Sequence, residues 1–337
     1  MWRTQCRRQV ARVANTSILG AQRYLANYTR TLLPLNNDTK IPALGFGTWQ
    51  DKDAQEDAVY HALNAGYRHI DTARVYGTEP AVAKGIARAN VPRSELYLTT
   101  KLWNNSHHPD DVLPALDASL KDLKTDYVDL YLMHWPGAFK SGPVLRPTKD
   151  GKVLTDNIDY LDTWKAMESL LSTGKTKSIG ISNFSKTEVE RLLSKSKTPP
   201  AVHQYECHPY LAQHSFADFH KSNNIHVTQY SPFGNSNTVY SKGKDIAKLI
   251  DDPMLADIGK KYGKNGAQVA LAWGIAKGRS VIPKSKTPSR IKLNLEGDFV
   301  LEDVDVGKID SLDRKLRFND PSDSFGYNFY VGLDGKE

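Results

Sequence analysis

The sequence predicts a single (β/α)8 (TIM) barrel, closed below by an N-terminal β-hairpin and carrying long βα loops. Eight short apolar runs are each followed by an amphipathic stretch, which is the pattern of a parallel sheet with crossover helices. The alternation continues from residue 29 onward without a break in composition, and this favours one closed barrel over an open doubly wound sheet. A Rossmann domain is disfavoured, because the nearest approach to G-x-G-x-x-G, the GFG at 45–47, continues as TWQ.

The elements follow in order. TLLPLNNDTKIPAL predicts two short strands around an Asn-Asn-Asp turn, which would cap the barrel bottom. The eight strand-like runs lie at 43–47, 67–71, 96–100, 127–134, 176–182, 201–206, 226–231 and 280–283. The stretches between them, such as DDVLPALDASLKDLK and KTEVERLLSKS, carry apolar residues at helical spacing. Two segments, 135–159 and 232–252, are longer than ordinary connections, and a long irregular C-terminus follows over 317–337. Long loops of this kind are typical of lids or binding loops.

The first residues differ in charge from the rest of the chain. The net charge is +7, yet residues 1–37 hold six arginines and no acidic residue, which leaves 39 basic and 38 acidic residues elsewhere. A nearly neutral body gives no support for a nucleic-acid partner. The acid-free, Arg-rich beginning is typical of a mitochondrial presequence, although a disordered tail or a wrongly chosen start codon would look the same.

We therefore predict a basic extension over residues 1–28 and one barrel domain over residues 29–337. The expected location is the cytoplasm, or the mitochondrial matrix if the extension acts as a presequence. No run approaches the ~18–20 apolar residues that a membrane helix needs, so no membrane partner is expected. The two cysteines, Cys6 and Cys207, are expected to be free thiols, and neither has neighbours spaced as metal ligands. We expect no metal.

Ionisable residues follow three consecutive predicted strands. Asp71 ends the second strand and Tyr76 lies in its loop, while Lys101 ends the third strand and His134 the fourth. Because the carboxyl ends of barrel strands meet at one face, these four side chains should converge. Taken singly, Asp71 could cap a helix, Lys101 could extend its ammonium group into solvent, and His134 could be a hydrogen-bonded histidine of the core. Their conjunction at successive strand ends favours a catalytic site.

The four groups are chemically complementary. A phenol has a pKa of ~10 in water, and a neighbouring lysine favours the phenolate while an aspartate keeps that lysine charged. Lowering the phenol pKa by two to three units needs roughly 3–4 kcal/mol of differential interaction. A histidine nearby can orient a carbonyl oxygen. The set predicts a proton donor for an oxygen that becomes negative, as when hydride attacks a carbonyl.

The segments GYRHIDTARVYGTE, TTKLW and LMHWP resemble the aldo-keto reductases over roughly residues 31–320. The resemblance implies a barrel fold and a catalytic tetrad of Asp71, Tyr76, Lys101 and His134. Within the family, the sequence most resembles fungal members that act on glycerol, glyceraldehyde and sugar aldehydes. This resemblance implies a monomer and a small-molecule carbonyl substrate. Thr78 departs from the family, which usually has Asn at that position.

Later strand ends supply candidates for holding a hydride donor. Ser182 and Asn183 follow one strand, Gln204 ends the next and Tyr230 the one after. From the residues alone, Ser182 and Asn183 could equally cap the helix that begins near Lys186. The resemblance implies that Ser182, Asn183 and Gln204 hold the carboxamide of nicotinamide and that Tyr230 stacks on its ring.

The run SVIPKSKTPSRIKLN gathers cations at the start of a predicted helix. Lys284, Ser285 and Arg290 together with free N–H groups predict a phosphate site, although a solvated basic turn is the ordinary alternative. The resemblance implies that this run binds the adenosine 2′-phosphate, so that NADPH/NADP+ is the cofactor. The other cofactor contacts that it implies are Thr48, Trp49, Asp71, Ser231, Phe233 and Asn294, with residues 231–244 as a strap over the pyrophosphate. Leu293 departs from the acidic residue of many members.

Three tryptophans, Trp49, Trp103 and Trp135, stand at loop starts. Together they would form an apolar wall that excludes water. The resemblance implies that they line the substrate pocket with Tyr76 and His134. Two other functions stay open: an NADPH-binding regulatory or redox-sensing subunit with little turnover, and a reductase of bulkier apolar ketones such as steroids or prostaglandins. The second would need a long apolar C-terminal loop, whereas SFGYNFYVGLDGKE is short and mixed.

Overall fold

A computed structural model describes residues 31–234 and 248–336. Its central sheet contains eight parallel strands in the order β12-β11-β10-β9-β6-β5-β4-β3. These strands are β3 (Phe46–Gly47), β4 (His69–Asp71), β5 (Tyr97–Leu102), β6 (Leu130–Met133), β9 (Ile179–Ser182), β10 (Val202–Glu206), β11 (His226–Tyr230) and β12 (Ser280–Val281). A parallel bridge from Leu44 to Val281 and a 2.9 Å bond from the Gly45 N–H to the Val281 carbonyl close the ring. The predicted (β/α)8 barrel is confirmed.

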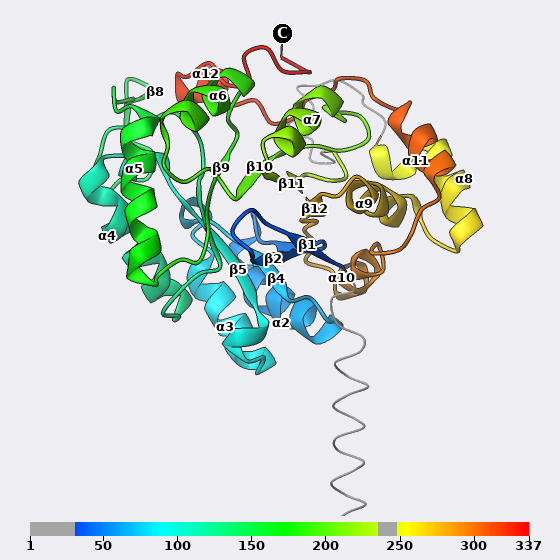
Figure 1. Ribbon diagram of the computed structural model, residues 1–337. Coiled ribbons are helices and arrows are strands. Elements are labelled where there is room, and N and C mark those ends of the chain that lie inside the picture. Colours follow the sequence, from blue (N-terminus) through cyan, green and yellow to red (C-terminus); the bar gives the residue numbers. More distant parts are fainter. Residues whose placement is uncertain (1–30, 235–247, 337) are drawn as a thin grey trace, which may run out of the picture.

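Helices surround the strands (Figure 1), and their buried apolar residues join the core clusters. They are α2 (Gln55–Ala65), α3 (Glu79–Ala89), α4 (Pro109–Leu123), α5 (Tyr160–Leu170), α6 (Lys186–Lys195), α7 (His214–Ser222), α8 (Pro253–Tyr262), α9 (Gly266–Ala276), α10 (Pro288–Leu295), α11 (Asp303–Asp310) and α12 (Ser322–Phe325). Side chains fix several of their starts. Ser185 with Glu188, and Asn265 with Gln268, form capping boxes at α6 and α9, which satisfy otherwise unpaired N–H groups.

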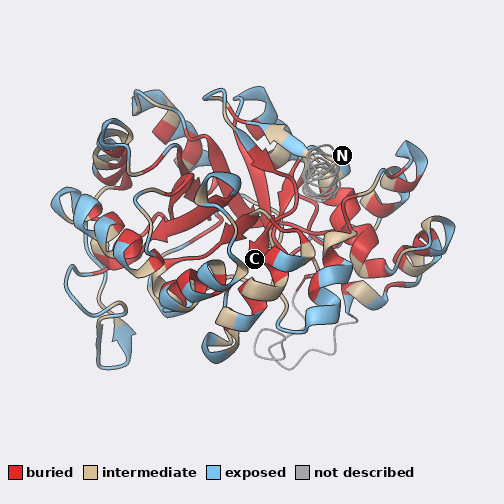
Figure 2. Cartoon of the chain, turned by 90° about the horizontal axis from the view of Figure 1, so that it is seen from below, coloured by how far each residue is buried: buried red, intermediate tan, exposed pale blue. Residues whose placement is uncertain are grey.

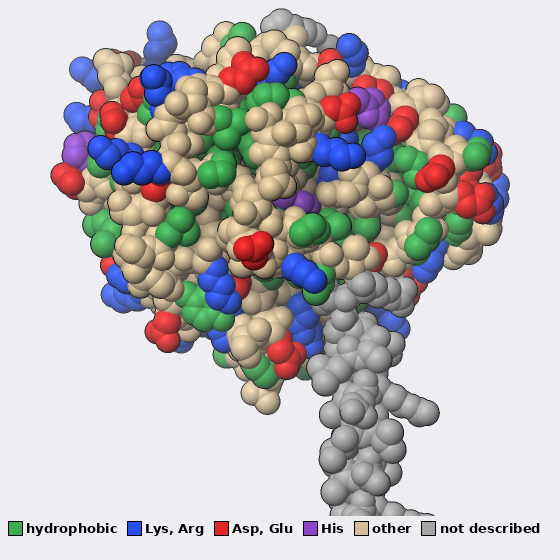
Figure 3. Space-filling model, viewed as in Figure 1, with side chains coloured by type: hydrophobic (Ala, Val, Ile, Leu, Met, Phe, Trp, Pro, Cys, Tyr) green, Lys and Arg blue, Asp and Glu red, His purple; other side chains and the backbone are tan. Residues whose placement is uncertain are grey.

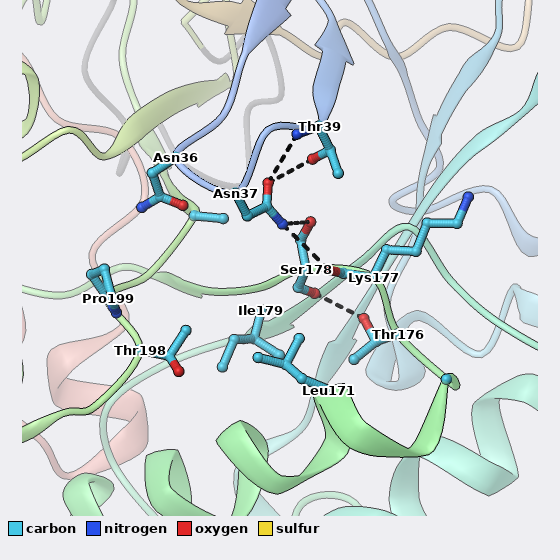
Figure 4. Close-up of a pocket in the computed structure, with 12 residues that line it drawn as sticks. Asn36, Asn37, Thr39, Leu171, Thr176, Lys177, Ser178, Ile179, Thr198 and Pro199 are labelled. Atoms are coloured by element: carbon cyan, nitrogen blue, oxygen red, sulfur yellow. Dashed lines mark hydrogen bonds between the residues drawn. The ribbon is translucent and has the colours of Figure 1, made fainter.

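The predicted hairpin consists of β1 (Leu32–Pro34) and β2 (Lys40–Pro42), and it covers the barrel bottom. Ile41 packs with Leu132 and Val202 inside the barrel, and the Asn37 amide donates to Ser178 Oγ over 2.8 Å. Beside this hairpin lies a pocket of about 510 Å³, at the end of the barrel opposite to the βα loops (Figure 4). Asn37 bonds the hydroxyls of Ser178 and Thr39 there, and the Thr176 hydroxyl donates to the Ser178 carbonyl, as the dashed lines show.

Burial follows the expected pattern, with the strands and inner helix faces buried and the outer faces exposed (Figure 2). One glycine is required by this packing. A Cβ on Gly180 would lie 2.4 Å from the Val202 carbonyl oxygen and 2.6 Å from a Leu132 methyl group. The close approach of β9 to its neighbours therefore depends on glycine two residues before Ser182.

Some regular elements were not predicted from the sequence. A small hairpin, β7 (Thr148–Lys149) with β8 (Lys152–Val153), lies in the long 135–159 segment. Helices α11 and α12 follow the barrel, and the segment after α11 returns across the loop face of the barrel, where Phe325 and Phe329 pack against Trp135. The predicted extension over residues 1–28 and Cys6 lie outside the described residues, and so do positions 235–244 of the predicted strap.

Acidic and basic side chains are intermixed on the face of the molecule that Figure 3 shows. Cys207 is buried and has a free thiol. Within residues 31–234 and 248–336, no helix combines the length and apolarity needed to cross a membrane.

Buried histidines predict that acid destabilises this fold. Burial lowers the pKa of His107 and of His226 to about 3, and the pKa of His69 to about 4. In the unfolded chain a histidine titrates near ~6.5, so the unfolded state binds more protons below that pH. The contribution of these histidines to the free energy of unfolding should be complete above pH ~6.5 and should fall as the pH drops toward 4. Urea denaturation at several pH values measures this change.

The variant His107→Leu should reduce this dependence. His107 is 1% exposed, and neither ring nitrogen has a hydrogen-bond partner among the described residues. At pH 5 the slope of unfolding free energy against pH should fall by about 1.4 kcal/mol per pH unit. Leu116→Ala is the control, because it removes buried volume from the neighbouring α4 without removing a titrating group. An unchanged slope in His107→Leu would contradict the prediction.

Candidate active site

Four predicted residues meet at the carboxyl ends of three adjacent strands. Asp71 is the last residue of β4, Lys101 lies near the end of β5 and His134 directly follows β6. Because β4 pairs with β5 and β5 with β6, their ends emerge side by side. Tyr76 reaches the same place from the short helix η2 (Arg74–Tyr76), which ends at Gly77 with φ 62°.

An ion pair forms the base of the site. Lys101 Nζ lies 2.5 Å from Asp71 Oδ1 and also donates to the Thr72 carbonyl over 2.9 Å. The Gln204 amide donates to the other oxygen, Asp71 Oδ2, over 2.7 Å. The side chains of Lys101 and Asp71 are 0% and 3% exposed. The two alternatives are therefore excluded: Asp71 does not cap a helix, and the ammonium group of Lys101 is not exposed to solvent.

The two rings lie beside this pair. Lys101 Nζ is 5.3 Å from the centre of the Tyr76 ring, and the Tyr76 and His134 rings meet edge-on at 5.7 Å. Burial lowers the pKa of Lys101, while the Asp71 carboxylate opposes that shift. Burial and the nearby Lys101 charge hold the pKa of His134 well below its usual value, so its imidazole is neutral at pH 7.

Thr78 belongs to a buried network behind Tyr76. Its hydroxyl lies 3.2 Å from that of Thr72, whose carbonyl binds Lys101. The next residue, Glu79, is fully buried and accepts hydrogen bonds from Thr100 Oγ over 2.7 Å and from Arg74 over 3.1 Å. Thr78 thus makes a hydroxyl contact with Thr72, and Arg74 ties η2 to Glu79.

A second cluster surrounds Asn183. Its amide donates to the His134 carbonyl and to Ser182 Oγ, each over 3.0 Å. Its Oδ1 accepts from the Tyr230 hydroxyl over 2.8 Å and from the Tyr330 hydroxyl over 2.9 Å. Burial raises the pKa of both phenols, so both remain donors. The capping alternative for Ser182 and Asn183 is wrong, because Ser185 caps α6.

The predicted phosphate site lies at the start of α10, and two lysines of this run are already paired. Lys284 forms an ion pair with Asp51, and Lys286 Nζ lies 3.1 Å from the other oxygen of that carboxylate. Ser285 Oγ accepts from the Thr287 N–H over 3.1 Å. Arg290 is exposed on the first turns of α10, and Asn294 is buried near its end.

The other predicted cofactor contacts are spread over several loops. Thr48 is buried and its hydroxyl donates to the Asp71 carbonyl over 3.0 Å. Trp49 is 38% exposed. Ser231 has φ 49° and its hydroxyl accepts from the Asn319 amide over 3.4 Å. Phe233 packs against the core just before the undescribed segment 235–247.

Aromatic side chains from the C-terminal segment complete the wall beside His134. Trp103 and His134 meet edge-on at 5.2 Å. Trp103 and Trp135 share a cluster with residues that our sequence reasoning had not assigned to the site: Phe139, Phe325, Phe329 and Tyr330. The closely spaced aromatic residues of SFGYNFY were the feature of the sequence that could have indicated this cluster. Trp103 and Trp135, two of the three predicted tryptophans, come together beside His134.

A barrel with buried ionisable groups gathered at the carboxyl ends of its strands has the architecture of a barrel enzyme. The model of the aldo/keto reductase family matches residues 43–314. An uncharacterized oxidoreductase of Schizosaccharomyces pombe is 46% identical over 302 residues, which cover 88% of this chain and 93% of that protein. This chain therefore belongs to the aldo-keto reductase family, a family of oxidoreductases acting on aldehydes and ketones, and the predicted resemblance is confirmed.

Vertebrate relatives agree with this result. Aldo-keto reductase family 1 member A1 of Xenopus tropicalis is 45% identical over 287 residues, covering 83% of this chain and 88% of that protein. The human protein of the same name is 40% identical over 292 residues, covering 84% and 90%.

The buried ion pair predicts a large cost for removing one partner. Asp71→Asn leaves the Lys101 ammonium without a counter-charge in the core, so the free energy of unfolding should fall by about 3–5 kcal/mol. The measurement is urea denaturation of the purified chain at pH 7.

The double variant Asp71→Asn/Lys101→Met is the matched comparison. It removes both charges together, so it should be more stable than Asp71→Asn alone. If Asp71→Asn costs less than about 1 kcal/mol, or if the double variant is the less stable of the two, the pair does not hold the site as described.

Proposed function

We propose that this protein is an NADPH-dependent reductase that converts an aldehyde or ketone to the alcohol and catalyses the reverse oxidation. The observation that carries the proposal is the buried Asp71–Lys101 pair lying below the Tyr76 ring and beside His134. Membership of the aldo-keto reductase family supports the reaction class. The proposed substrates are glyceraldehyde, dihydroxyacetone or sugar aldehydes, as for a glycerol dehydrogenase (NADP).

Tyr76 is the proposed proton donor. A cation beside a phenol lowers its pKa, and Lys101 is the cation nearest to that ring among the contacts described. Asp71 keeps Lys101 charged against the cost of burial and fixes its position. His134 is neutral, so it can orient the carbonyl oxygen through a hydrogen bond without adding a second positive charge.

A nicotinamide cofactor supplies the hydride when it is bound. Two features of the chain fit such a group. The buried side chains of Ser182, Asn183 and Gln204 offer hydroxyl and amide groups for a carboxamide, beside the Tyr230 ring. At α10, Lys284 and Lys286 already hold a carboxylate anion, which shows that these cations can bind a negative group there. Ser285 and Arg290 would extend the same contact, and Asn294 would contact the adenine.

The polar residues after Trp103 take part in holding the loops. Asn105 donates to the Gly142 and Val144 carbonyls, and Asn104 and His107 are buried. Polar side chains after Trp103 would suit hydroxylated substrates, but the burial of Asn104 and His107 and the loop contacts of Asn105 give that interpretation little direct support. The aromatic cluster of Trp103, Trp135 and the C-terminal residues supports a second candidate function, the reduction of bulkier apolar ketones. A panel of polar and apolar carbonyls with purified enzyme would separate the two.

Tyr76→Phe tests the assigned proton donor. The variant should oxidise NADPH with glyceraldehyde at less than a tenth of the parent rate, because general acid catalysis contributes ~10²–10⁴-fold. The measurement is the loss of NADPH absorbance at saturating substrate. Tyr60→Phe, a phenol on the outer helix α2, should leave the rate unchanged.

A Tyr76→Phe rate above about a tenth of the parent rate would show that another group is the acid. Negligible turnover by the parent enzyme over the whole carbonyl panel, with NADPH bound, would instead favour a regulatory or redox-sensing subunit.

Lys284→Ala tests the choice of cofactor. Charge-assisted hydrogen bonds contribute ~1.5–3 kcal/mol, so the Kd for NADPH should rise about 10- to 100-fold while the Kd for NADH changes far less. Tryptophan fluorescence quenching in the absence of substrate gives both constants. Lys292→Ala, which removes an exposed cation from α10, the helix that follows Lys284, is the control. Equal effects on NADPH and NADH would contradict the assignment.

A further inference from the structure

The carboxylate that holds the phosphate-site lysines belongs to Asp51, which stands in a different loop. Asp51 ends the connection between β3 and the short helix η1 (Lys52–Ala54), whereas Lys284 and Lys286 follow β12. We propose that Asp51 is a determinant of cofactor selectivity: an internal anion that competes with the cofactor's 2′-phosphate for these lysines. This inference rests on the proposed NADPH dependence.

The barrel closure brings the two loops together. The Gly47 N–H donates to the Pro283 carbonyl over 2.9 Å, so the strands that precede the two loops are joined just before Asp51 and Lys284. Asp51 itself is fixed, because its carbonyl accepts from the Ala54 N–H over 2.9 Å and its φ is 51°. The carboxylate is therefore presented to the lysines by a defined turn.

The charges at this site favour competition. The hydrogen bonds from Lys284 and Lys286 lower the pKa of Asp51, so the carboxylate is ionised at pH 7. The side chains of Asp51 and Lys284 are 29% and 27% exposed, so water and salt screen the pair only in part.

A phosphate monoester carries about −1.5 to −2 charges at pH 7. To reach Lys284 and Lys286 it must either break the bonds to Asp51 or lie beside a carboxylate of the same sign, and both weaken its binding. A cofactor with a 2′-hydroxyl meets no such repulsion, and a carboxylate can accept a hydrogen bond from that hydroxyl. Asp51 should therefore reduce the ratio of the affinity for NADPH to the affinity for NADH.

A second aspartate in the same loop offers a matched control. Asp53 lies two residues further on, is exposed and sits on η1. Asp53→Asn changes the net charge of the loop by the same amount as Asp51→Asn, without touching the lysine pair. Any general effect of loop charge on an anionic cofactor should appear in both variants.

The experiment measures the Kd for NADPH and for NADH by tryptophan fluorescence quenching, without substrate, in the parent chain and four variants. Asp51→Asn should tighten NADPH binding about 3- to 10-fold and leave NADH within twofold or weaken it. Asp51→Ser should tighten NADPH binding similarly, which guards against an effect special to asparagine. Asp53→Asn should leave both constants within twofold, and Lys284→Ala should weaken NADPH binding.

The outcomes separate this inference from the proposed function. Suppose that Lys284→Ala weakens NADPH binding but both Asp51 variants leave NADPH binding unchanged or weaker. Asp51 then does not compete with the phosphate, and this inference is overturned while the proposed NADPH dependence stands. If the parent binds both cofactors equally and Lys284→Ala alters neither, the cofactor assignment fails and the inference fails with it. Equal tightening by Asp53→Asn would also overturn the inference, since general charge would then explain the effect.

Discussion

The Asp71–Lys101 ion pair is the constraint on which the rest of the site depends. A fully buried ammonium is stable only with a partner and satisfied hydrogen bonds, and Lys101 has both, from Asp71 and from the Thr72 carbonyl. The same aspartate binds Gln204 across the barrel. One carboxylate therefore fixes side chains from β5 and β10. The position of His134 relative to them follows from the pairing of β5 with β6, whereas Tyr76 is placed by the short helix η2 after β4.

The arrangement divides two requirements between different parts of the barrel. The strand ends hold charges rigidly in a dry environment, where electrostatic effects are strong. The lysines that pair with Asp51 lie at the edge, on a loop, and their side chains are partly exposed to water. This division allows a site to keep its catalytic geometry while the affinity for a ligand is tuned separately.

Much of this could be predicted from sequence, because barrel topology converts strand-end positions into neighbours. Asp71, Lys101 and His134 needed only the strand assignment to be placed together. The Asp51 contact with Lys284 could not be predicted in this way, since it depends on a left-handed turn and on side-chain direction. The aromatic residues after α11 were also missed, because an irregular segment has no periodicity that tells where it returns.

Tyr330 adds a consequence for how such an enzyme can change. Its ring belongs to the aromatic wall, while its hydroxyl binds Asn183 in the proposed carboxamide cradle. The C-terminal segment thus belongs both to the aromatic wall and to the hydrogen bonds around Asn183. Asn183 Oδ1 also accepts from the Tyr230 hydroxyl, so a change at Tyr330 would remove one of its two phenol donors. Reshaping the aromatic wall and loosening the hold on Asn183 are therefore coupled in this barrel.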